Sequence, residues 1–316
     1  MITNKIFVSF TILQIFQIGT LAQVNENYFV SDSLKNPPIN LIHSKTDSTN
    51  NFDSHREFLP EFYKIFTDVP TNFYKFGKEA INKNSIGPIL AVSLITTGLI
   101  ITDQKNWENS KIIFNKNPSL KSISGITVNI GDAKWQIGLA SAAALYGYIA
   151  KDNRIIKTSF ESIEAVISSG LFVQLLKRIS GRESPAVYTT PGGYWDLFPD
   201  LGEYQHRQPE YYAFPSGHIT SLTAFLTVIN NNYPEVKWLK SASIFLIGAL
   251  GISLVENNMH WFSDLPLGIL IGYTFGNIIS GTKEENSQTE TSAIPKFRFT
   301  PYVKYNCYGL ECTVRF

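Results

Sequence analysis

The sequence from residue 215 to residue 233 is Pro-Ser-Gly-His-Ile-Thr-Ser-Leu-Thr-Ala-Phe-Leu-Thr-Val-Ile-Asn-Asn-Asn-Tyr, and it contains no Asp, Glu, Lys or Arg. Its apolar side chains do not alternate with polar ones, which argues against a β-strand. Pro215 suits the first turn of a helix. Similar uncharged stretches recur, and we expect a helix from each: Ile86–Thr102, Trp135–Ala150, Ala165–Leu176, Ile219–Tyr233, Ser241–Val255 and Leu265–Thr282. The predicted fold class is all-α, a helical bundle of six core helices.

The composition limits the class of protein. The 316 residues include 27 Lys and Arg and 26 Asp and Glu, for a net charge of +1. This balance argues against a nucleic-acid-binding protein, because such proteins usually carry a basic excess. Charged residues make up 17% of the chain, below the roughly 25% of ordinary soluble domains. The chain therefore buries more surface than usual or places it in lipid.

The N-terminal segment has the pattern of an export signal. Lys5 precedes the apolar stretch Ile6–Ile18, and the small residues Thr20 and Ala22 follow. This order predicts a signal peptide over residues 1–22 that is cleaved after Ala22. An uncleaved anchor helix is the alternative.

Two further regions flank the core helices. Residues 23–55 form a polar arm, after which Glu57–Asn82 predicts two short amphipathic helices, interrupted at Pro70, that lie on a core or on a bilayer surface. The helical domain is expected to end at residue 282, with a linker and a β-hairpin over residues 283–316. Cys307 and Cys312 flank the expected hairpin tip. The sequence leaves open whether they form a disulfide or stay as thiols.

The start of the fourth helix has the chemistry of an anion site. In Pro215-Ser216-Gly217-His218, Ser216 and Gly217 leave backbone N–H groups free at the positive end of the helix dipole, and glycine permits close approach. His218 is then placed to donate a proton. A helix start with an incidental surface histidine is the structural alternative.

A second histidine lies between the fifth and sixth helices, in His260-Trp261-Phe262-Ser263-Asp264. The four-residue spacing lets Asp264 reach one ring nitrogen of His260. The other nitrogen is then free to act as a nucleophile or base. A capping aspartate beside a packed histidine is the alternative. Lys177 and Arg182 belong to a third feature, a group of cations after the third helix that alone would indicate only helix capping.

Together, these three features resemble the type 2 phosphatidic acid phosphatase superfamily, which includes lipid phosphatases, bacterial acid phosphatases and vanadium haloperoxidases. The resemblance covers roughly Ile86 to Ser280. It implies that His260 is the catalytic nucleophile that forms a phosphohistidine, that Asp264 orients it, and that His218 protonates the leaving oxygen. It also implies phosphate binding by Lys177, Ser216 and Gly217, with no metal and no cofactor.

Two positions depart from the family pattern. Ser184 and Leu254 occupy the places of the two motif arginines that clamp the phosphate. We expect Arg182 to substitute as a phosphate ligand, since it lies two residues before Ser184. His206 and Arg207 are further candidates, because they lie in the loop Ala186–Phe214, which we expect to fold over the site as a lid.

The membrane topology is not settled by the sequence. A cleaved signal places Gln23 outside the cytoplasm. If all six helices spanned, the loop after the third would face inward and the basic loop Lys151–Lys157 outward, against the positive-inside tendency. Membrane members of the family carry their site on the outer face. Most segments are shorter than the ~20 residues of a span, which favours a soluble or peripheral exported bundle over an integral membrane protein.

The expected function is hydrolysis of a phosphate monoester or pyrophosphate. The resemblance implies a metal-independent phosphatase of the cell envelope or periplasm. The expected substrate is a phospholipid or isoprenoid phosphate, of the phosphatidate or undecaprenyl diphosphate type, with membrane contact. The alternative is a catalytically silent envelope protein that binds an anionic headgroup or a partner. Vanadate-dependent halide oxidation is a third, weaker hypothesis, since vanadate needs the same arginine clamp.

Overall fold

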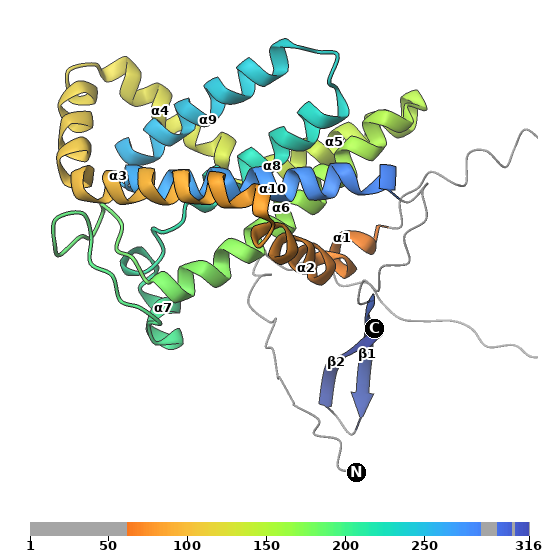
Figure 1. The fold of residues 1–316 in the computed structure, drawn as a ribbon. Helices are drawn as coiled ribbons and strands as arrows, with labels where there is room; N and C mark the ends of the chain where they lie inside the picture. The colour runs from red at the N-terminus through yellow and green to blue at the C-terminus, as the bar shows by residue number, and fades with distance from the viewer. Residues whose placement is uncertain (1–61, 286–295, 305–306, 316) are drawn as a thin grey trace, which may run out of the picture. The chain divides into compact units, whose positions relative to one another are not determined.

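The computed structural model describes residues 62–285, 296–304 and 307–315. The predicted signal peptide and polar arm lie outside these residues. The α-helices are α1 Lys64–Thr67, α2 Val69–Ala80, α3 Lys83–Asn115, α4 Pro118–Gly131, α5 Ala133–Ala150, α6 Asn153–Ser180, α7 Leu201–His206, α8 Gly217–Asn232, α9 Trp238–Glu256 and α10 Leu265–Glu285. Short 3₁₀ turns are η2 Gln208–Glu210 and η3 Phe262–Asp264. The all-α prediction is confirmed, and each predicted core helix is present (Figure 1).

Helices α6, α8 and α10 pack together at the centre (Figure 1). Glycines on α10 recur every fourth residue and face α8. A Cβ added to Gly268 would lie 2.9 Å from the Ser216 carbonyl oxygen, and one on Gly272 would lie 2.3 Å from that of Thr220. Small residues at this spacing let two helix backbones approach closely. The close pairing fixes the start of α8 beside the start of α10.

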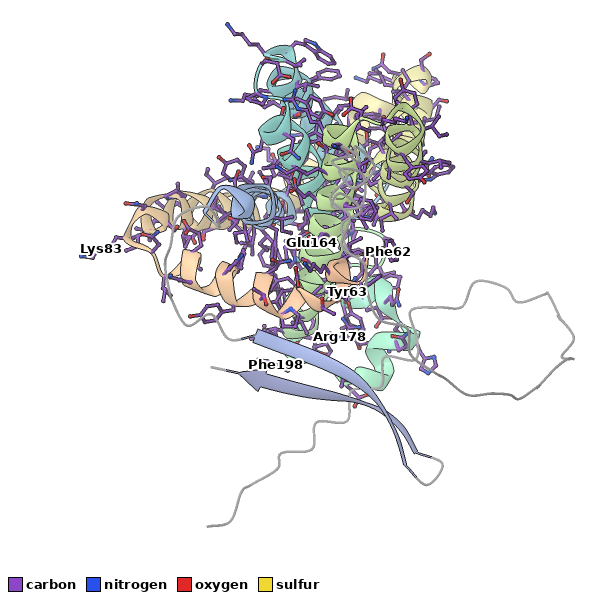
Figure 2. The ribbon with its side chains drawn as sticks, turned by 90° about the vertical axis from the view of Figure 1, so that its right-hand side faces the viewer. Phe62, Tyr63, Lys83, Glu164, Arg178 and Phe198 are labelled. Carbon is purple, nitrogen blue, oxygen red and sulfur yellow. The ribbon has the colours of Figure 1, made fainter. Side chains whose placement is uncertain are left out.

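The amphipathic region before α3 packs on this central group. Pro70 stands in the first turn of α2, so the predicted interruption marks a helix start. The Phe76 ring stacks on Phe275 of α10 at a centroid distance of 4.9 Å. Asn72 donates a hydrogen bond of 2.8 Å to Glu164 of α6, which Figure 2 labels. This region therefore contacts the protein core.

Two helices are much longer than predicted, and two others, α4 and α7, were not predicted. The sequence placed the end of one helix at Thr102, but α3 runs on to Asn115, and α6 has 28 residues. Charged residues had been taken as helix ends. Asp103 does not end α3, because its carboxylate is buried and paired with Arg182. Helix α4 was not predicted; Pro118 stands in its first turn.

Four helical segments are long and apolar enough to cross a membrane: Lys83–Asn115, Asn153–Ser180, Trp238–Glu256 and Phe262–Gly281. Only 6% of the most apolar stretch of α3 is buried within the protein. Large exposed side chains on this helix include Leu90, Leu94 and Ile101. The first and last predicted segments were expected to approach span length. The expectation of segments too short to span was wrong for Asn153–Ser180 and Trp238–Glu256, where charged residues continue the helix.

The C-terminal segment contains two strands, β1 Lys296–Lys304 and β2 Cys307–Arg315, paired antiparallel with Lys304 opposite Cys307. The turn therefore precedes Cys307, whereas the sequence had placed it between Cys307 and Cys312. Both cysteines lie on one strand.

Candidate active site

The start of α8 forms one wall of the site. Ser216 is buried and caps the helix, since its side chain accepts a hydrogen bond from the Ile219 backbone N–H at 3.4 Å. The hydroxyl keeps its own hydrogen for a ligand. The sequence predicted a free backbone N–H at Ser216, but this group donates a hydrogen bond of 2.9 Å to the Asp264 carbonyl oxygen. This bond ties the start of α8 to the turn that precedes α10.

Lys177 reaches the same point from the last turn of α6. Its Nζ lies 3.8 Å from the position that a Cβ on Gly217 would take. The residue is 5% exposed, and its ammonium lies 5.0 Å from the centre of the Tyr212 ring. A buried cation next to free helix N–H groups is suited to hold an anion.

His260 is fully buried, and its two ring nitrogens differ. Nδ1 lies 2.7 Å from the Ala213 carbonyl oxygen, which can only accept, so Nδ1 carries the hydrogen. Nε2 is buried and has no hydrogen-bond partner among the described residues. It is therefore the unprotonated nitrogen, with a lone pair available for reaction. Burial lowers the pKa of His260, and the nearby Lys177 adds to this, while Asp264 opposes it.

Asp264 approaches His260 but is not its closest partner. Its Oδ2 lies 3.6 Å from Nδ1, beyond a normal hydrogen bond. The tautomer is set by Ala213, a carbonyl that the sequence spacing did not point to. Asp264 itself is firmly held, because Oδ2 accepts from the Trp261 backbone N–H at 2.6 Å and Oδ1 from Arg182 at 2.5 Å. It contributes mainly negative charge beside the imidazole.

His218 stands opposite His260, with ring centroids 6.1 Å apart. At an interplanar angle of 70°, the two rings are in edge-to-face contact. Burial, together with the neighbouring His260 and Lys177, lowers the pKa of His218 to about 3, while Asp132 opposes this shift. A bound phosphate dianion would reverse this, because an opposite charge favours the protonated imidazole.

Arg182 is fully buried and belongs to a network of carboxylates. Nη1 donates to Ser263 Oγ at 2.6 Å and to Asp264 Oδ1 at 2.5 Å. Nη2 donates to Asp103 Oδ2 at 2.8 Å and to the Gly192 carbonyl oxygen at 2.6 Å. Only Nε has no partner among the described residues. The terminal nitrogens expected to clamp a phosphate are thus already bonded to protein oxygens.

The comparison with known proteins agrees with this arrangement. Residues 160–287 match the PAP2 superfamily. The matched region contains Lys177, the start of α8 and the segment from His260 to Asp264 in the family's order.

Residues 160–287 belong to the PAP2 superfamily. A solved structure that the chain resembles is described as the first transmembrane PAP2 type phosphatidylglycerolphosphate phosphatase from Bacillus subtilis. That likeness has a TM-score of 0.43 at 14% identity, and it covers 63% of this chain and 96% of the other. No curated protein matches the sequence.

The two positions that lack the PAP2 motif arginines differ in environment. Leu254 is fully buried and packs with Ile219 and Leu250 in an apolar cluster. Ser184 is also buried, and its Oγ has no hydrogen-bond partner among the described residues.

The loop Ala186–Phe214 contains α7 and η2 and is bound to the PAP2 site at its base. The buried Glu183 carboxylate accepts from the backbone N–H groups of Thr189 and Tyr194. Gly193 has a φ of 82°, and a Cβ there would lie 2.8 Å from Trp261 Nε1, so glycine is required.

The predicted lid residues do not lie at the site formed by His260, His218 and Lys177. His206 and Arg207 are both exposed, and Arg207 pairs with Glu210 at 2.8 Å. Neither has a hydrogen bond or ring contact to His260 or Lys177 in the described part of the chain. The structure brings together the other predicted site residues but leaves these two outside.

The sequence did not predict three groups of the site: the Asp103 carboxylate, the Ser263 hydroxyl as a bridge, and the Ala213 carbonyl. Asp103 carried one signal, a carboxylate directly after the apolar stretch Ile86–Thr102. Carboxylates at such positions are costly and usually paired. The Ala213 carbonyl has no sequence signal, because every residue has one.

Proposed function

We propose that the chain is a metal-independent phosphatase that hydrolyses a phosphate monoester or pyrophosphate through a phosphohistidine at His260. The observation that carries this proposal is the buried Nε2 of His260, which has no partner in the described part of the chain. A buried polar atom without a partner is costly unless a ligand satisfies it. The neighbouring cation and helix start supply the site for that ligand's negative charge.

In the first step, His260 Nε2 attacks phosphorus, and the bond from phosphorus to the leaving oxygen breaks. His218 gives its proton to that oxygen, so an alcohol or a phosphate departs. Nδ1 keeps its hydrogen, which stays hydrogen-bonded to the Ala213 carbonyl oxygen, and Asp264 stabilises the positive charge that develops on the imidazole. Lys177, the Ser216 hydroxyl and the Gly217 N–H bind the phosphate oxygens.

In the second step, water attacks the phosphohistidine. His218, now neutral, takes the proton from the water, and the bond between phosphorus and Nε2 breaks. Inorganic phosphate leaves, and both histidines return to their starting state. Arg182 has Nε–H as its one remaining donor to the phosphate, so we assign most of the phosphate binding to Lys177 and the start of α8.

We propose a lipid phosphate or pyrophosphate as the substrate, of the phosphatidate or undecaprenyl diphosphate type. Lys177 lies near the C-terminal end of one candidate span, and His260 lies between the ends of two others. A site at the ends of membrane-spanning helices lies at headgroup depth. The phosphate then reaches the histidines while its hydrocarbon chain stays in lipid.

We propose export to the cell envelope. The basic residues Lys151, Arg154 and Lys157 lie at the start of α6, at the opposite end from Lys177. By the positive-inside tendency, the end that carries the site faces outward. Cysteine labelling of intact cells tests this. In a chain that carries Cys307→Ser and Cys312→Ser, Phe198→Cys, near the C-terminal end of α6 (Figure 2), should react with an impermeant maleimide. Labelling only after lysis refutes it.

Phosphate release from lipid phosphates, without added metal, tests the activity. His260→Ala should abolish release, whereas His206→Ala, at an exposed histidine of α7, should leave it unchanged. Brief incubation with ³²P-labelled substrate should trap an acid-labile, base-stable phosphoenzyme in the wild type only. Activity that survives His260→Ala would refute the mechanism.

A catalytically silent protein that binds an anionic headgroup is the second candidate. Its support is the core packing of Leu254 and the bonding of Arg182 to protein oxygens, which together leave the site with fewer phosphate donors. Phosphate binding without turnover across the lipid phosphates would favour it. Turnover that depends on both His218 and His260 would reject it.

A further inference from the structure

Asp103 lies in α3, outside the residues that match the family, and is fully buried. It accepts three hydrogen bonds from the region around Asp264. Two come from Ser263, through its backbone N–H at 3.1 Å and through its hydroxyl. The third comes from Arg182 Nη2 at 2.8 Å. Both Ser263 and Arg182 are in turn next to Asp264, by sequence or by hydrogen bond.

The charges of this group have a consequence for His260. Arg182 alone beside Asp264 would largely neutralise it, and the carboxylate would then do little for a positive charge on the imidazole. Asp103 pairs with Nη2 of Arg182 at 2.8 Å, whereas Asp264 pairs with Nη1 at 2.5 Å. Two carboxylates thus share one cation, and the group keeps one net negative charge beside His260.

The bonds also fix the geometry of the turn. Asp103 holds the Ser263 backbone, and Ser263 precedes Asp264 in η3. Arg182 holds the carboxylate of Asp264 itself. Asp103 therefore restrains both the backbone and the side chain of the residue beside the nucleophile.

We propose that Asp103 is a positioning residue for the phosphoryl-transfer site, which acts through Arg182 and Ser263 to place Asp264 and preserve its negative charge toward His260. This inference rests on the proposed function for its catalytic meaning. It also gives Arg182 a role other than the phosphate clamp predicted from its position.

The test compares Asp103→Asn with Glu256→Gln in the purified full-length chain. Glu256 is a matched control, because its side chain is 2% exposed, pairs with Lys111 of α3 at 3.5 Å, and has no hydrogen bond or ion pair to Asp264 or Arg182 in the described residues. Each variant removes one buried negative charge, in α3 for Asp103 and beside α3 for Glu256. Only the first should change the site.

For Asp103→Asn, we expect kcat about tenfold to a hundredfold lower with KM within about twofold, since small displacements at a reacting centre cost this much. For Glu256→Gln, kcat should stay at the wild-type value. Equal losses of kcat in the two variants would overturn the proposal, because they would indicate general destabilisation.

A second readout does not depend on turnover. The pKa of His260, followed by NMR with ¹³C-labelled histidine, should fall by about one in Asp103→Asn, because a negative charge is removed nearby. Lys177, His218 and Asp264 also face this imidazole and are unchanged in both variants. An unaltered pKa would overturn the proposal. If the wild type releases no phosphate, the proposed function fails, and this pKa comparison still decides the role of Asp103.

If Asp103→Asn does not fold, Ser263→Ala tests the same route. It removes the hydroxyl that bonds to both Asp103 and Arg182 and keeps every charge. We expect kcat about threefold to tenfold lower, the effect of one net hydrogen bond. A wild-type kcat in a folded Ser263→Ala protein would overturn the proposal.

Discussion

Replacement of Gly272 by alanine tests the close packing that joins the two halves of the site. An added Cβ would lie 2.3 Å from the Thr220 carbonyl oxygen and 2.8 Å from Thr223 Cβ. Ordinary contacts are about 3.5 Å, so α8 and α10 must separate by about 1 Å. Because the nearest atom is backbone, no side-chain rotation relieves the clash.

The energy follows from two opposing effects. Overpacking costs about 1–3 kcal/mol, and the upper end applies where backbone is displaced. Alanine recovers about 1 kcal/mol of helix propensity over glycine. The net destabilisation of Gly272→Ala is therefore about 2 kcal/mol, which lowers Tm by about 4–8 °C for a domain of this size. A 1 Å displacement of α8 should also reduce kcat by up to about a hundredfold.

Thermal unfolding in detergent, with phosphate release measured beside it, gives the result. Gly248→Ala on α9 is the matched control, since a Cβ there meets nothing within 4 Å. It should raise Tm slightly and leave kcat unchanged. A Gly272→Ala protein as stable as Gly248→Ala would refute the inferred backbone contact between α8 and α10.

Four other predictions concern the charge of Lys177, the protonation of His218 and the core position of Leu254. Lys177→Gln should weaken phosphate binding by about tenfold to a hundredfold, because a charge-assisted hydrogen bond is lost. Arg178→Gln, at a residue stacked on Tyr204, should bind phosphate as the wild type does. Competition by inorganic phosphate measures the affinity of both variants. The pKa of His218 is lowered to about 3 and rises when phosphate binds. Phosphate binding should therefore take up a proton and tighten as pH falls from 8 to 6. Calorimetry in buffers of different ionisation enthalpy measures this proton uptake, which should be absent in His218→Gln. Because the folded pKa lies below the unfolded value of about 6.5, this histidine should also reduce stability as pH falls below 6.5, which denaturation of the wild type and His218→Gln across pH checks. Leu254→Arg, which restores a family arginine, should destabilise the fold by about 3–5 kcal/mol, because it buries an unpaired charge. Leu254→Met should cost under about 1.5 kcal/mol. Equal stability of the two variants would show that this position is not in the core.

Much of the fold and the site was predictable where the interactions are local. The start of α8 follows from Ser216 and Gly217, because capping and helix dipole depend on neighbours in sequence. Pro215 was predicted in the first turn, but it precedes the N-cap Ser216. The four-residue spacing of His260 and Asp264 brought them within 3.6 Å. Helix ends were less predictable: α3 continues through Asp103, since a distant arginine compensates its charge.

The role of Arg182 was the least accessible from sequence. Its position near Ser184 suggested a replacement phosphate ligand, but its partners Asp103 and Asp264 lie 79 and 82 residues away in the chain. A guanidinium forms its bonds with whichever acceptors the fold brings near. No local pattern specifies them.

The sequence by itself determined a helical chain that resembles the PAP2 superfamily, with two histidines, a lysine and a helix start suited to an anion. These features depend on spacing within single helices or turns. Only the tertiary structure decided which nitrogen of His260 is free, because that depends on the Ala213 carbonyl, 47 residues away. It also decided that Asp103 shares Arg182 with Asp264. Buried charges need partners, and folding selects those partners from distant parts of the chain.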